Sequence, residues 1–130
     1  AQPWIGKVDM VVGIESRGFL FGMGLAQFLK VPFVPIRKKG KLPRKTISQS
    51  YDLEYGSATI EIHHEDIKPG TRVLIHDDLL ATGGTAIAAS LLLKKAEAIT
   101  SGFSFIVDLE FLKATAKLQE YASSHSLVQY

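Results

Sequence analysis

The sequence contains no cysteine, which excludes disulfide bonds and thiol chemistry and fits a reducing compartment. No apolar run approaches the roughly 20 residues that a membrane-spanning helix needs. The chain begins with Ala1, and the residues that follow lack the basic end and apolar core of a signal peptide. We therefore expect a cytoplasmic protein with no membrane partner. Its 130 residues suffice for one hydrophobic core, so we predict a single domain.

Acidic residues are missing from one basic segment. Six of the 15 lysines and arginines lie between Arg37 and Lys45, whereas acids outnumber bases in the rest of the chain. So compact a segment favours a local anionic partner over nucleic acid, whose binding surfaces are usually broader. The alternative is a solvated loop without a partner.

The middle of the chain combines an apolar strand, two carboxylates, a glycine turn and a helix. Val73–His76 is apolar and rich in β-branched residues, which predicts a strand buried on both faces. Asp77 and Asp78 stand where this strand is expected to end. The small residues 81–85 then lead into a predicted helix at 86–95. This order is typical of a ligand-binding loop at the carboxyl end of a strand in an α/β fold.

The turn has the chemistry of a phosphate site. Gly83 and Gly84 lack a Cβ atom, so their backbone N–H groups can approach a ligand closely. The start of the following helix adds its positive dipole, and Thr82 and Thr85 add hydroxyl donors. The alternative is a simple strand-to-helix turn.

Asp77 and Asp78 suit a sugar attached to that phosphate, because carboxylates accept hydrogen bonds from hydroxyl groups. The loop is no Walker A motif, since Gly84 is followed by Thr85 and Ala86 and not by Lys-Ser/Thr. Nor does it contain the G-x-G-x-x-G pattern of a dinucleotide site. The sequence thus predicts a sugar-phosphate site.

Two further loops offer donors for anions. Ser16 and Arg17 follow the first predicted strand, and ligands of open α/β sheets lie at the carboxyl ends of strands. Arg37 can bind a phosphate with two parallel hydrogen bonds, and Lys41 can add a point charge. The stretch 37–50 has little periodicity and is long for a connection, which favours a lid.

The remaining patterns predict the rest of the sheet. Pro32 and Pro35 in the second strand, 31–36, indicate an irregular or edge strand. Alternation in 51–55 and 57–63 predicts an antiparallel ribbon outside the parallel sheet.

Three elements are expected towards the C-terminus: a strand at 101–108, a helix at 110–121 and a short strand at 126–129. His63 and His64 are interpreted as surface or hairpin residues, because adjacent strand residues face opposite sides and no third metal ligand is evident.

Four segments resemble the type I phosphoribosyltransferases, and they occur in that family's order. They are Glu15–Phe19, Arg37–Pro43, Tyr51–Gly56 and Val73–Thr85. The resemblance runs from Val8 to the C-terminus and is strongest to the branch that acts on adenine. It implies an α/β fold in which helices flank a central parallel sheet, with a flexible lid at about 37–50 and an antiparallel ribbon. It also implies an N-terminal segment before the first core strand, so we expect a truncated chain.

The activity implied by this resemblance is transfer of a phosphoribosyl group from phosphoribosyl pyrophosphate (PRPP) to adenine. The products are AMP and pyrophosphate, as in purine salvage, and the enzyme is expected to be a homodimer. Mg²⁺ would be bound mainly through PRPP and pyrophosphate oxygens.

The resemblance also implies the residue roles. Glu54 moves a proton at the purine, Tyr55 packs in the lid, and Arg17 with Leu79 flanks the base. The remaining expected contacts are the 5′-phosphate at Ala81, Thr82, Gly83, Gly84 and Thr85, the ribose at Asp77 and Asp78, and the pyrophosphate at Ser16, Arg17, Arg37 and Lys41. The family further implies a cis peptide between Glu15 and Ser16.

Two alternatives remain open. A regulator of the same fold could sense PRPP or a purine without catalysis, although it would tend to lose the lid bases and Glu54. A sibling transferase could act on another base, because in this family the N-terminal segment helps to recognise the base.

Overall fold

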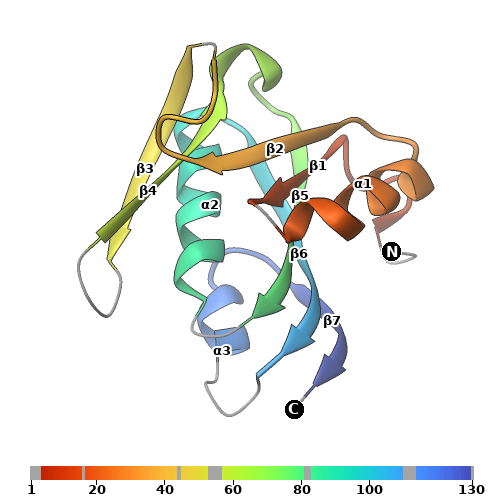
Figure 1. Cartoon of the computed structure of the whole chain (residues 1–130). Coiled ribbons are helices and arrows are strands. Elements are labelled where there is room, and N and C mark those ends of the chain that lie inside the picture. Colours follow the sequence, from red (N-terminus) through yellow and green to blue (C-terminus); the bar gives the residue numbers. More distant parts are fainter. Residues whose placement is uncertain are drawn as a thin grey trace.

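The computed structural model describes residues 4–15, 17–43, 45–52, 57–80, 83–109 and 114–129. Within them, seven strands form one sheet in the order β3-β4-β2-β1-β5-β6-β7 (Figure 1). The strands are β1 Met10–Ile14, β2 Phe33–Lys38, β3 Thr46–Asp52, β4 Ser57–His63, β5 Arg72–Leu80, β6 Ile99–Asp108 and β7 Ser124–Gln129. The helices are α1 Gly18–Leu29, α2 Gly84–Lys95 and α3 Ala114–Leu118, with a 3₁₀ turn, η2, at His64–Asp66. No helix in the described part of the chain has the length and apolar character needed to cross a lipid bilayer.

Strand β5 lies inside the sheet and is parallel to both of its neighbours, β1 and β6. Val73, Leu74, Ile75 and His76 are all buried, as the apolar run predicts. Such a run needs cover on both faces of the sheet, and α1 and α2 supply it. The predicted α/β fold with a central parallel sheet is confirmed.

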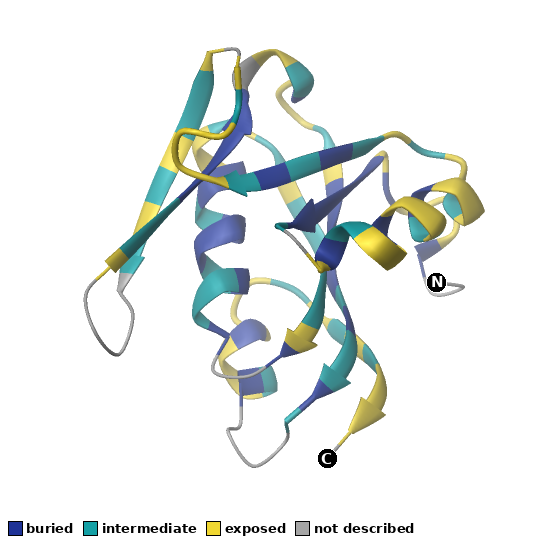
Figure 2. Ribbon diagram, in the orientation of Figure 1, coloured by how far each residue is buried: buried dark blue, intermediate teal, exposed yellow. Residues whose placement is uncertain are grey.

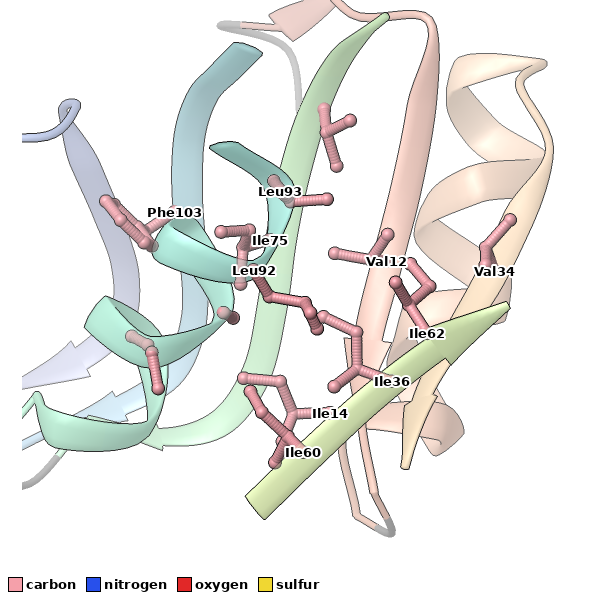
Figure 3. Close-up of a cluster of buried hydrophobic side chains, with 14 of the residues drawn as sticks. Val12, Ile14, Val34, Ile36, Ile60, Ile62, Ile75, Leu92, Leu93 and Phe103 are labelled. Carbon is pink, nitrogen blue, oxygen red and sulfur yellow. The ribbon is translucent and has the colours of Figure 1, made fainter. Parts of the chain in front are cut away.

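The two faces of the sheet carry cores of different size. Val12 and Ile75 point towards α2, where they pack with Leu92 and with many aliphatic side chains of the ribbon (Figure 3). Val11 and Leu74, one residue earlier on each strand, belong to the smaller core on the α1 face, since successive strand residues face opposite sides. The outer side of α1 stays exposed (Figure 2).

Part of β2 lies at an edge, as its prolines indicated, although the strand stands between β4 and β1 in the sheet order. The carbonyls of Pro32 and Ile36 accept hydrogen bonds from β1, so Pro35 between them faces away from β1, where its missing N–H is not needed. On the other side β4 pairs with β2 only at Arg37 and Lys38, beyond the proline.

The antiparallel ribbon of β3 and β4 is confirmed, but it is joined to the sheet through the short β2–β4 pairing. The predicted irregular stretch 37–50 is shorter than expected. Strand β2 continues to Lys38 and β3 already begins at Thr46, so the connection spans 39–45. The Nζ of Lys95 donates a hydrogen bond to the carbonyl of Ser48 at 2.8 Å, which ties the ribbon to α2. Movement of this lid remains a prediction.

Two smaller expectations were wrong in extent or place. His63 is buried, with 7% of its surface exposed, and its Nδ1 lies 3.2 Å from an oxygen of Asp66. The η2 turn brings Asp66 back under β4, so His63 is no surface residue. Helix α3 covers only Ala114–Leu118 of the predicted 110–121, of which 110–113 lie outside the described residues.

Candidate active site

The carboxyl ends of β2, β1 and β5 lie side by side. Gly13 of β1 is aligned with Pro35 of β2 and His76 of β5. The next residues along these three strands therefore approach one another at one edge of the sheet. Segments that are far apart in the sequence supply the anion donors and the carboxylates of this edge.

Strand β5 does not end at His76, as the sequence had indicated, but runs on to Leu80. Strand β6 continues to pair with it as far as Asp108, whereas β1 stops at Ile14. The backbone of the two predicted sugar-binding carboxylates is thus part of the strand and is fixed by β6. This makes their placement more rigid than a loop would.

Asp77 is packed against the start of α1. A Cβ atom on Gly18 would lie 3.0 Å from the His76 carbonyl oxygen and 3.3 Å from Asp77 Oδ1, so a larger residue would require these groups to shift. The Asp78 N–H donates to Asp77 Oδ1 at 2.8 Å. Burial raises the pKa of Asp77 to about 7; the neighbouring Asp78 carboxylate adds to the rise, and the Asp78 N–H opposes it. Asp77 is therefore poised to ionise when a donor arrives.

Asp78 faces a different partner. Its Oδ2 lies 3.2 Å from Nε of Arg17, whose side chain is 74% exposed. An exposed ion pair of this kind is weak and can be exchanged for ligand contacts. The structure thus brings together Asp78, which was predicted to bind the ribose, and Arg17, which was predicted to contact the pyrophosphate and the base.

The glycine turn has the expected form where it is described. Gly83 has φ +88°, a left-handed conformation that favours glycine, and Gly84 begins α2. A cavity of about 70 Å³ opens at this helix start. Its lining consists of Asp77, Leu79, Leu80, Gly83, Gly84, Thr85, Ala86 and Phe105. Ala81 and Thr82 lie outside the described residues.

A cationic cluster stands across from the turn. Arg37 and Lys41 both contact the carboxylate of Glu15, at 3.3 and 3.1 Å. A second cavity, of about 170 Å³, lies between Arg37 of this cluster and Thr85, which follows the glycine turn. Glu15 and Arg37 line it on one side, and Asp77 and Thr85 line both this cavity and the first.

Three further predicted site residues cannot be placed, because Ser16, Glu54 and Tyr55 also lie outside the described residues. The expected cis peptide between Glu15 and Ser16 includes Ser16, so it cannot be described either. Leu79 is 37% exposed and lines the smaller cavity, where an apolar ring could rest on it.

Comparison with known proteins gives a consistent result. The family model of the phosphoribosyl transferase domain matches residues 5–108. The chain belongs to the phosphoribosyltransferase family. It is 53% identical over 125 residues to an adenine phosphoribosyltransferase of Christiangramia forsetii, covering 96% of this chain and 72% of that protein. For the enzyme of that name from Cytophaga hutchinsonii the identity is 50% over 123 residues, with 94% and 68% covered.

Solved structures agree with these relatives. The crystal structure of adenine phosphoribosyltransferase from Rhodothermus marinus has a TM-score of 0.91 at 48% identity, covering 95% of this chain and 70% of that one. The Saccharomyces cerevisiae structure, complexed with an imino-altritol bisphosphate and adenine, has a TM-score of 0.87 at 47% identity, with 93% and 68% covered. The type I phosphoribosyltransferase fold predicted from the motifs is confirmed.

Glu15 is the residue of the cationic cluster that sequence reasoning missed. It was part of the matched segment Glu15–Phe19 but received no role. Its signal was its position directly after a buried parallel strand, in a chain that carries a compact basic segment elsewhere. Only the sheet order brings the two together.

Proposed function

We propose that this phosphoribosyltransferase transfers the 5-phosphoribosyl group of PRPP to adenine and releases AMP and pyrophosphate. One observation carries the proposal. Asp77 and Thr85 line both cavities and Arg37 lines the larger of the two, so the phosphate turn, one of the paired carboxylates and part of the cationic cluster face adjoining cavities. A ligand with an anion at each end and a diol between them matches this arrangement.

The turn would hold the 5′-phosphate of PRPP through N–H groups at the start of α2 and the Thr85 hydroxyl. Asp77 and Asp78 would accept hydrogen bonds from the ribose hydroxyls. These donors stabilise the charged form of Asp77, and the carboxylates then lie near the ring as positive charge develops on it. Arg37 and Lys41 would bind the departing pyrophosphate.

The reaction breaks the bond from the anomeric carbon to a pyrophosphate oxygen and forms one to a purine nitrogen. We assign the accompanying proton transfer at the purine to Glu54 and the packing of the lid to Tyr55. Arg17 and Leu79 flank the base in this proposal, since both lie at the open edge beside Asp77 and Asp78.

Mg²⁺ is the metal that suits this site. The described residues contain no group of three or more His, Cys, Asp or Glu side chains that could hold a metal. We propose that the cation is carried mainly by diphosphate oxygens. Its chemistry would be to neutralise charge on the pyrophosphate. Arg37 and Lys41 would grip the same group from the protein side.

Homodimer formation is supported by helix α1. Four of its large apolar side chains are exposed by between 55% and 75% of their surface. They are Leu20, Phe21, Met23 and Phe28. Exposed large apolar side chains on one helix favour a protein partner, and we propose a second copy of the chain, which light scattering on the purified protein would test. We also place the enzyme in the cytoplasm, which cell fractionation would test.

The decisive experiment is an assay of the whole protein with Mg–PRPP and each of adenine, guanine, hypoxanthine, xanthine and orotate. Turnover restricted to adenine supports the proposal. Turnover of a different base would identify a sibling transferase. Binding of Mg–PRPP without turnover of any base would identify a regulator.

A further inference from the structure

We propose that Glu15 is a positioning residue of the pyrophosphate site, because its carboxylate holds Arg37 and Lys41 in place for the leaving group. This inference rests on the proposed function. It adds a residue that would act through two cations and not by touching the substrate.

Glu15 accepts hydrogen bonds from three residues of the basic segment, namely Arg37, Lys38 and Lys41. Its Oε1 accepts the Lys38 N–H at 2.9 Å and Nε of Arg37 at 3.3 Å. Its Oε2 accepts Nη2 of Arg37 at 3.4 Å and Nζ of Lys41 at 3.1 Å. One carboxylate therefore contacts the end of β2, the guanidinium of Arg37 and the ammonium group of Lys41 in the lid connection.

The exposure of these groups shows which one is the anchor. The side chain of Glu15 is 8% exposed, whereas those of Arg37 and Lys41 are 35% and 50% exposed. Burial alone would raise the pKa of Glu15, but the donors from Lys38, Lys41 and Arg37 lower it to about 2. Glu15 thus stays charged at any working pH and lies beneath the cations.

Arg37 and Lys41 each keep hydrogen-bond donors that Glu15 does not use. Glu15 occupies the Nε–Nη2 edge of the guanidinium and one ammonium proton of Lys41, which leaves Nη1 of Arg37 and two Lys41 protons for an anion. Two positive charges on one carboxylate leave a net charge of +1 beside the larger cavity. Without the anchor, both long side chains would move freely in water and would have to be ordered when pyrophosphate binds.

The test compares Glu15→Gln with a control at the other end of β1. Asp9 precedes β1 and accepts hydrogen bonds from Nε, Nη2 and the backbone N–H of Arg72 at 2.9 to 3.1 Å. Like Glu15, it binds a guanidinium and a backbone N–H, although its side chain is more exposed, at 45%. Asp9→Asn therefore reports the cost of losing such a contact away from the site.

Titration calorimetry with Mg–pyrophosphate at fixed salt measures the effect directly. Glu15→Gln should weaken binding about tenfold, the scale of one charge-assisted hydrogen bond, and should raise the KM for PRPP similarly while leaving the KM for adenine nearly unchanged. Asp9→Asn should bind like the parent. In an Arg37→Ala background, Glu15→Gln should have a clearly smaller effect, because one of its two targets is gone.

Several results would overturn the inference: unchanged or tighter pyrophosphate binding by Glu15→Gln, equal losses in Glu15→Gln and Asp9→Asn, or an undiminished effect in the Arg37→Ala background. If Glu15→Gln does not fold, Glu15→Asp replaces it, since it keeps the charge but withdraws the carboxylate and should also weaken binding.

The binding assay does not depend on turnover. A parent protein that binds Mg–pyrophosphate but converts no base would refute the proposed function and still allow the Glu15 comparison. A parent that binds no pyrophosphate would refute both.

Discussion

Replacing Asp77 by asparagine should stabilise the fold while it damages the site. Asparagine has the shape of the neutral carboxylic acid and can still accept the Asp78 N–H bond. The raised pKa of Asp77 means that the folded protein binds a proton more tightly than the unfolded chain does. Ionisation of Asp77 therefore reduces stability as the pH rises through the interval between the unfolded and folded values, about 3.8 to about 7.

The magnitude follows from this interval. A rise of about three units corresponds to ~4 kcal/mol as an upper limit, at about 1.4 kcal/mol per unit. Local relaxation and the access of water to this edge reduce that limit, so we expect a gain of roughly 1–3 kcal/mol above pH 7. The gain should shrink steadily as the pH falls and should be close to zero near pH 4.

Urea denaturation of parent and Asp77→Asn protein between pH 4 and pH 8, without ligand or Mg²⁺, measures the difference. Asp9→Asn is a control in which the free energy of unfolding should change in the opposite direction, because hydrogen bonds from Arg72 lower the pKa of Asp9 to about 2. Its stabilising contribution is present above about pH 4 and is lost as the pH falls further, so Asp9→Asn should be less stable at pH 7. A stability difference for Asp77→Asn that is independent of pH, or a loss at pH 8, would refute the reasoning. If the variant is more stable but loses turnover, Asp77 lowers the stability of the fold and is needed for activity.

Four further predictions concern the site, the core and the lid. Glu54→Gln should lower kcat by ~10²–10⁴-fold and change PRPP affinity by no more than a few-fold, as expected for lost proton transfer. If steady-state kinetics show that the variant converts adenine at the parent rate, Glu54 has no catalytic role. Gly83→Ala should cost about 1 kcal/mol or more, because alanine is strained at φ +88° and its Cβ would lie 3.3 Å from that of Ala114, and calorimetry should show weaker AMP binding. Leu92→Ala, at a fully buried position under the sheet, should lower the free energy of unfolding by ~2–5 kcal/mol, with kinetics at low temperature nearly unchanged. Hydrogen exchange in 39–45 should slow when Mg–PRPP binds; equal protection in both states would indicate a static connection.

Much of the fold could be predicted because its signals are local. The apolar run at Val73–His76 identified a strand buried on both faces, and the glycine turn before α2 identified a helix start. Alternation in β4 predicted its antiparallel pairing. These features depend on side-chain spacing and backbone freedom within a few residues, so the sequence shows them directly.

Element ends and strand environments depend on neighbours that sequence does not reveal. Strand β5 extends past His76 because β6 continues to pair with it. Pro35 is tolerated because β4 pairs with β2 only beyond it. Both outcomes depend on strands that are distant in the sequence, whereas the partner of the buried His63 is Asp66, three residues further on in the η2 turn.

In the site, too, some features were determined by the sequence and others by the tertiary structure. The sequence by itself determined its chemistry: small residues for phosphate, paired carboxylates for a diol, and a basic segment for an anion. Tertiary structure alone decided that Glu15 lies under Arg37 and Lys41, because β1 and β2 are parallel neighbours whose carboxyl ends adjoin. It also decided that Asp77 is held near its titration point, since burial against the start of α1 is a property of packing and not of the Asp-Asp pair.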